Sequence, residues 1–129
     1  MKRYIPFILL AVLGLLINAC YYDEELELPQ DNEPITEEVS FSADIQPLFD
    51  QSCVQCHGGN LNIAPILESD VAYDILINEG YVIPLDGEAS ILYRSLIGDG
   101  VALMPPSAPW SAQKINTVKA WIDQGAKDN

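Results

Sequence analysis

The stretch Cys53-Val54-Gln55-Cys56-His57 decides how this chain folds. On a helical turn, side chains three positions apart lie on the same face, so the two thiols point in the same direction. The imidazole follows the second thiol directly, and the whole chain contains one His and three Cys. Two thiols beside the only imidazole indicate a site for a covalently held or metal-containing group.

The CxxCH spacing is typical of c-type haem attachment, in which each thiol forms a thioether with a haem vinyl group and the His ligates the iron. We therefore predict one haem c, bound covalently through Cys53 and Cys56, with His57 as an axial ligand. A structural zinc site needs four Cys or His ligands, and no second pair exists. A thioredoxin-like pair needs a βαβ context, and a plain disulfide leaves His57 unexplained.

The second axial ligand must come from elsewhere in the chain. Since His57 is the only His, two His ligands from one domain are excluded. Met104 is the only Met besides Met1, and Pro105 and Pro106 follow it. Two Pro residues favour a stiff, non-helical loop that holds a thioether against iron at little entropic cost. We predict Met104 as the second ligand, the alternative being a Met that fills a gap in the core.

Apolar residues at helical spacing predict four further elements around the motif. The predicted helices are Ala43–Gln51, Val71–Glu79, Ala89–Ile97 and Ala112–Gln124. Ser69-Asp70 and Ser111 are expected to cap the second and fourth of them. A Gly follows each of the last three helices, where it favours termination.

Taken together, these residues resemble a class I cytochrome c domain. The resemblance rests on CVQCH at 53–57, LMPP at 103–106 and a C-terminal amphipathic helix that contains Trp121, and it covers about residues 39–126. It implies a small all-α fold of four to five short helices around one haem, with the terminal helices crossing beside it. It also implies that Phe49, four residues before the first Cys, packs near Trp121.

The N-terminus indicates export. A basic start precedes the apolar run Ile5–Ile17, which as a helix is roughly 20 Å long and too short for a bilayer core of about 30 Å. The run ends at Asn18-Ala19-Cys20 and resembles a bacterial lipoprotein signal. This resemblance implies that residues 1–19 are removed and that Cys20 is lipidated. The alternatives are an ordinary signal peptide and an uncleaved anchor.

Residues 20–38 are predicted to be an acidic, flexible linker, and residues 39–129 the cytochrome c domain. From Tyr21 to Glu38 the chain holds eight acidic residues and no basic one. The whole chain has a formal charge of −13; without residues 1–19 its side-chain charge is 4 − 19 = −15, and the domain carries 4 − 11 = −7. Phosphate recognition needs clustered Lys and Arg, so nucleic-acid partners are excluded.

These features predict a membrane-tethered electron carrier rather than an enzyme. A haem with a protein ligand on each face of its iron has no open position for peroxide or oxygen. The predicted location is the bacterial cell envelope, on a periplasmic or outer-membrane face. The expected partners are redox proteins with basic docking patches, the cytochrome c maturation machinery and the lipid membrane, which the chain contacts through Cys20.

Two other classes stay open. One is a haem enzyme or gas sensor, peroxidase-like, that releases Met104; its distal acid–base group would have to be Arg94, since no second His exists. The other is a surface lipoprotein without haem. In the electron carrier, Arg94 is predicted to bond a haem propionate, the alternative being a solvated Arg on a helix.

Overall fold

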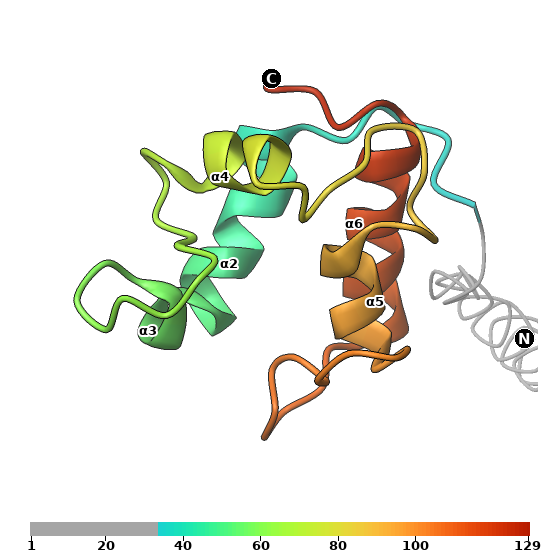
Figure 1. Ribbon diagram of the computed structural model, residues 1–129. Coiled ribbons are helices and arrows are strands. Elements are labelled where there is room, and N and C mark those ends of the chain that lie inside the picture. Colours follow the sequence, from blue (N-terminus) through green and yellow to red (C-terminus); the bar gives the residue numbers. More distant parts are fainter. Residues whose placement is uncertain (1–33) are drawn as a thin grey trace, which may run out of the picture.

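Residues 34–129 are described by a computed structural model, and they form an all-α structure (Figure 1). Its helices are η2 (Phe41–Ile45), α2 (Gln46–Ser52), α3 (Val54–His57), α4 (Ala72–Asn78), α5 (Ile91–Ile97) and α6 (Ala112–Asp123). No strand occurs in this part of the chain, which confirms the predicted class. The predicted signal peptide, Cys20 and the linker up to residue 33 lie outside the described residues.

The first helix begins two residues before the predicted start, as the π-helix η2 that continues into α2. Ser40 Oγ accepts from the backbone N–H of Ala43 at 3.2 Å, and Asp44 Oδ2 accepts from the N–H of Ser40 at 2.8 Å. This reciprocal cap satisfies donors that a helix start leaves free. The usual capping pattern places its acid three residues after the cap, whereas here it comes four residues after. Because the acid is displaced by one residue in the wider π turn, the usual capping pattern does not locate the start of this helix at Phe41.

Two other helix starts differ from the prediction. Helix α4 begins at Ala72 and its N-cap residue, Val71, forms no side-chain cap, so the predicted Ser69-Asp70 cap is wrong. Helix α5 begins two residues late because Ser90 is fully buried and extended. Its hydroxyl accepts from the N–H of Ile83 at 2.9 Å and donates to Asp86 O at 2.8 Å. These bonds hold Ser90 in the preceding loop.

The start of α6 and the end of α5 match the prediction, whereas the ends of α2, α4 and α6 each differ from it by one residue. Ser111 Oγ accepts from the N–H of Lys114 at the start of α6, which confirms the predicted cap. Gly98 ends α5 in the left-handed region, at a φ of +71°. Gly is favoured there because it has no Cβ to clash with the backbone.

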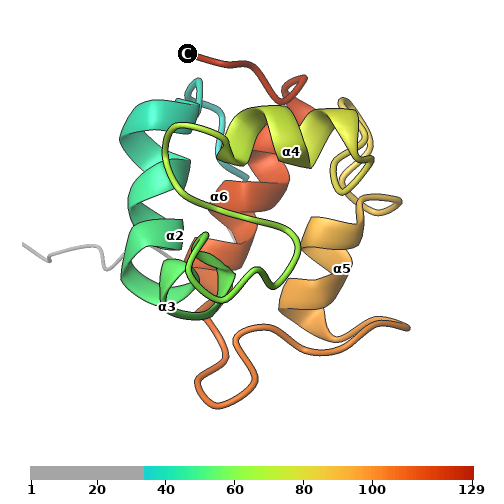
Figure 2. The same cartoon turned by 60° about the vertical axis from the view of Figure 1, so that its left-hand side comes forward.

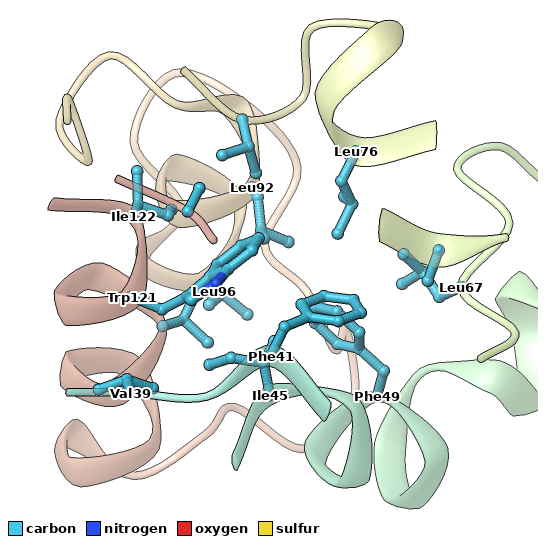
Figure 3. Close-up of a cluster of buried hydrophobic side chains, with 14 of the residues drawn as sticks. Val39, Phe41, Ile45, Phe49, Leu67, Leu76, Leu92, Leu96, Trp121 and Ile122 are labelled. Carbon is cyan, nitrogen blue, oxygen red and sulfur yellow. The ribbon is translucent and has the colours of Figure 1, made fainter. Parts of the chain in front are cut away.

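The hydrophobic core lies between α6 and the N-terminal helices, as Figure 3 shows. The Phe41 ring centroid is 5.2 Å from that of Trp121 and 6.4 Å from that of Phe49. Phe49 and Trp121, which were expected to pack near each other, thus share one cluster in which Phe41 contacts both. The buried apolar residues are Val39, Phe41, Ile45, Phe49, Leu67, Ala72, Leu76, Val82, Leu92, Leu96, Trp110, Val118, Trp121, Ile122 and Ala126.

Hydrogen bonds join the two ends of the described chain. Gln124 Oε1 accepts from the N–H of Val39 at 2.8 Å, and Gln124 Nε2 donates to Glu37 O at 2.8 Å. Asn129 Oδ1 accepts from the N–H of Phe41 at 2.9 Å. Helix η2 also packs against α6. The first and last helices are therefore fixed against each other, and contacts with the domain begin before Val39.

The elements divide between two ends of the molecule. Both views place α4 near the C-terminus, whereas α3 and residues 98–111 lie at the opposite end (Figures 1 and 2). Helix α5 packs alongside α6. Across residues 34–129, no helix combines the length and the apolar character that a membrane span requires.

Phe41→Ala is expected to lower the free energy of unfolding by about 3–5 kcal/mol, because it opens a cavity against three aromatic rings. Urea unfolding followed by circular dichroism measures the change. The matched control is Leu85→Ala, whose side chain is 73 % exposed, with an expected effect within about 0.5 kcal/mol. Equal unfolding midpoints for the two variants would contradict the packing of Phe41.

Candidate functional site

The Cys53–His57 turn lies where α2 gives way to α3. Cys53 O accepts from the backbone N–H of Cys56 at 3.0 Å and of His57 at 2.8 Å, so the motif is helical as predicted. Cys53 is partly buried, Cys56 is exposed, and both thiols are free. The local fold therefore presents both thiols and the imidazole from a single turn.

The two thiols differ in their surroundings. Burial, and after it the neighbouring Cys56 thiol, raises the pKa of Cys53 to about 11, while the charge of Lys114 acts in the opposite direction. Cys53 is therefore a protonated thiol at neutral pH. Since the thiolate is the attacking form in thiol–disulfide exchange, this protonation slows formation of a Cys53–Cys56 disulfide.

In the haem-free chain, Cys56 is expected to react with iodoacetamide faster than Cys53, because it is exposed and Cys53 is mostly protonated. The rate at Cys53 should rise about tenfold per pH unit up to a pH of about 11, since alkylation needs the thiolate. Mass spectrometry of the alkylated peptides measures both rates. Equal rates at pH 8 would show that Cys53 is not shielded in solution.

The ring of His57 is oriented by backbone carbonyls. Its Nδ1 lies 3.0 Å from Pro65 O and 3.3 Å from Ile63 O. Because carbonyl oxygens only accept, Nδ1 carries the proton of the neutral ring and Nε2 carries the lone pair. Metal-ligating His residues are commonly held in this way, with the second nitrogen bonded to a carbonyl. Nε2 is therefore the atom that is available as a ligand.

The loop that supplies these carbonyls turns back directly after His57. His57 O accepts from the N–H of Leu67 at 2.7 Å, which closes the loop. Gly58 makes the turn possible, since a Cβ at this position would lie 2.7 Å from Val54 O. The carboxylate of Glu68 covers the same turn, with Oε2 3.1 Å from where a Cβ of Gly59 would stand.

Met104 lies in the irregular segment between α5 and α6, as predicted. It is partly buried, and its backbone N–H donates to Ser95 O of α5 at 2.8 Å. Its segment and the turn that carries His57 lie at the same end of the molecule (Figures 1 and 2). The two predicted iron ligands thus come from separate elements of one region.

Arg94 has a protein partner. Its Nε donates to Asp99 O at 3.1 Å and lies 3.5 Å from Asp99 Oδ2. The guanidinium is therefore held by the segment that follows its own helix. The contact with a haem propionate stays a prediction.

Further features of this region escape sequence patterns. The carbonyls of Ile63 and Pro65 belong to the backbone, so no residue type reveals them.

Trp110 is buried, and its Nε1–H finds no acceptor among the described residues. The Lys114 ammonium lies 5.9 Å from the Trp110 ring centroid. A buried donor without an acceptor is costly, so a bound group or water that accepts from it would stabilise the fold.

Exposed apolar side chains lie close in sequence to the two predicted ligands. Within residues 34–129, no three His, Cys, Asp or Glu side chains gather into a metal-binding cluster. Leu61 and Ile63 follow His57, Ile97 and Leu103 precede Met104, and all four side chains are between 37 % and 57 % exposed. An apolar ring with polar edges, such as haem, would remove such side chains from water.

Comparison of the chain with models of protein families, with curated proteins and with solved structures found no match in any of the three. The fold and the site define a small all-α domain with one CxxCH turn and one Met-Pro-Pro loop at the same end.

Proposed function

We propose that this protein is a single-haem c-type cytochrome, with a class I cytochrome c-like fold, that carries electrons in the bacterial cell envelope. Cys53 and Cys56 would hold the haem through thioethers, and His57 and Met104 would ligate the iron. The bound haem supplies a one-electron redox couple.

The hydrogen bonding of the His57 ring is the observation that carries this proposal. In the neutral ring, the two carbonyls at Nδ1 favour the tautomer whose lone pair lies on Nε2, which is the form that metal ligation requires. The ring stands on the same turn as the two thiols, and the chain has no other His. A His that served only packing would need neither the thiols nor this tautomer.

Met104 supports the same ligand set. Two Pro residues follow it, its backbone is bonded to α5, and its side chain is neither fully buried nor fully exposed. A Met that only fills a gap in the core would be buried instead. A thioether ligand raises the reduction potential compared with two His ligands. With both axial positions taken by protein side chains, the site suits electron transfer rather than chemistry on oxygen or peroxide.

The charge of the chain suggests its partners. The domain has a side-chain charge of −7, which would steer it towards redox proteins with basic patches. The cytochrome c maturation machinery would form the thioethers. Lipidation of Cys20 would tether the protein to the membrane, with residues 20–38 as the spacer.

A redox titration of the purified protein tests the proposal. The full chain is expressed together with the cytochrome c maturation machinery, and a pyridine haemochrome assay counts haem per chain. We expect one covalent haem, a single one-electron transition and the weak near-red sulfur-to-iron band in the oxidised form. Absence of covalent haem would refute the proposal, and a high-spin spectrum would favour the haem enzyme or gas sensor.

A further inference from the structure

Arg94 braces the turn that leads from α5 towards Met104. Its Nε donates to Asp99 O at 3.1 Å and pairs with Asp99 Oδ2 at 3.5 Å. Its Nη2 stands 2.6 Å from the point where a Cβ of Gly100 would lie. The guanidinium is therefore packed directly against the backbone of this turn, with about a third of the side chain exposed.

The Met104 segment is tied to α5 at two consecutive residues. Arg94 O accepts the N–H of Asp99 at 2.9 Å, and Ser95 O accepts the N–H of Met104 at 2.8 Å. The residues between these bonds form a loop that starts and ends on the same turn of α5. Gly98 and Gly100 both have positive φ, of +71° and +69°, so this loop follows a path that other residues adopt with difficulty.

We propose that Arg94 is a positioning residue for the Met104 thioether, and this inference rests on the proposed function. A loop of this length samples many conformations unless its turn is fixed, and ordering each residue costs free energy. The guanidinium fixes the first two residues of this loop, Asp99 and Gly100. Arg94 thereby favours the conformation in which Met104 is held at the site, and it acts through the loop rather than through contact with the iron or a propionate.

Imidazole binding to the oxidised holoprotein measures this effect. Imidazole reaches the iron only in molecules from which Met104 has moved away, so its apparent affinity reports the population of that open form. In Arg94→Gln we expect the apparent affinity to rise by about threefold to tenfold, the range for a partly exposed charge-assisted hydrogen bond. The near-red sulfur-to-iron band should disappear at lower imidazole concentration by the same factor.

The chain offers a matched control and two variants that sharpen the test. Lys127→Gln, two residues before the C-terminal residue, also removes a cation that forms one ion pair, here with Glu38. It should change imidazole affinity by less than about twofold. Asp99→Asn keeps the backbone acceptor of Arg94 Nε, so it should raise imidazole affinity less than Arg94→Gln does. Gly100→Ala places a methyl group against Nη2 and should act in the same direction as Arg94→Gln.

An imidazole affinity in Arg94→Gln equal to that of the parent overturns the inference. If the reduction potential of that variant shifts at the same time, the result identifies Arg94 as a propionate partner instead. Hydrogen exchange of the Met104 amide gives a readout that does not depend on haem, and it should be faster in Arg94→Gln than in Lys127→Gln. If the parent holds no haem, the proposed function fails. Equal exchange rates of the Met104 amide in the two variants would then also refute the positioning role of Arg94.

Discussion

Met104→Ala is expected to keep the haem attached and to open one face of its iron. The proposed thioethers through Cys53 and Cys56 and the proposed ligand His57 do not depend on position 104, so haem content should stay at one per chain. The near-red sulfur-to-iron band should vanish and the reduction potential should fall, because the thioether no longer ligates the iron. Imidazole affinity should rise by about 100-fold if the open form makes up about 1 % of the parent protein.

Absorption spectra, a redox titration and an imidazole titration measure these three effects on one sample. The neighbouring variant Leu103→Ala is the matched control, since its side chain is also partly exposed and carries no ligand atom. It should keep the sulfur band of the parent, because the thioether of Met104 is intact. A sulfur band that persists in Met104→Ala would exclude Met104 as the ligand.

Replacing Cys53 and Cys56 together by Ala is expected to abolish covalent haem attachment. In the parent, haem should remain with the protein in acidified organic solvent, whereas in the double variant all of it should be extracted. The single variant Cys56→Ala should keep one thioether and an intermediate amount of covalent haem. Cys56 is exposed, so its substitution removes little packing. A loss of covalent haem in this variant therefore reflects the missing thioether rather than unfolding of the protein.

The control for this experiment is the third Cys of the chain. Cys20→Ser should release the protein from the membrane and leave its haem spectrum unchanged, because Cys20 is expected to carry lipid and not haem. Haem that resists extraction in the double variant would show attachment elsewhere. Loss of covalent haem in Cys20→Ser would contradict the division of the three thiols between lipid and haem.

Most of the fold is predictable because its signals are local. Apolar spacing located the helices, and Ser111 and Gly98 act within one helical turn of the ends that they mark. The wrong helix starts at Phe41 and Ser90 have different causes. The Ser40–Asp44 cap spans a wider π turn, and the Ser90 hydroxyl bonds atoms of a loop that only the folded chain brings close.

The sequence by itself determined the chemical components of the proposed site, namely two thiols, one imidazole and one thioether, because His, Cys and Met are all rare in this chain. The tertiary structure decided how they are presented. The tautomer of the neutral His57 ring depends on carbonyls six and eight residues away, and the partner of Arg94 depends on the path of a loop. Backbone atoms and loop paths have no residue signature, so their role emerges only when the chain has folded.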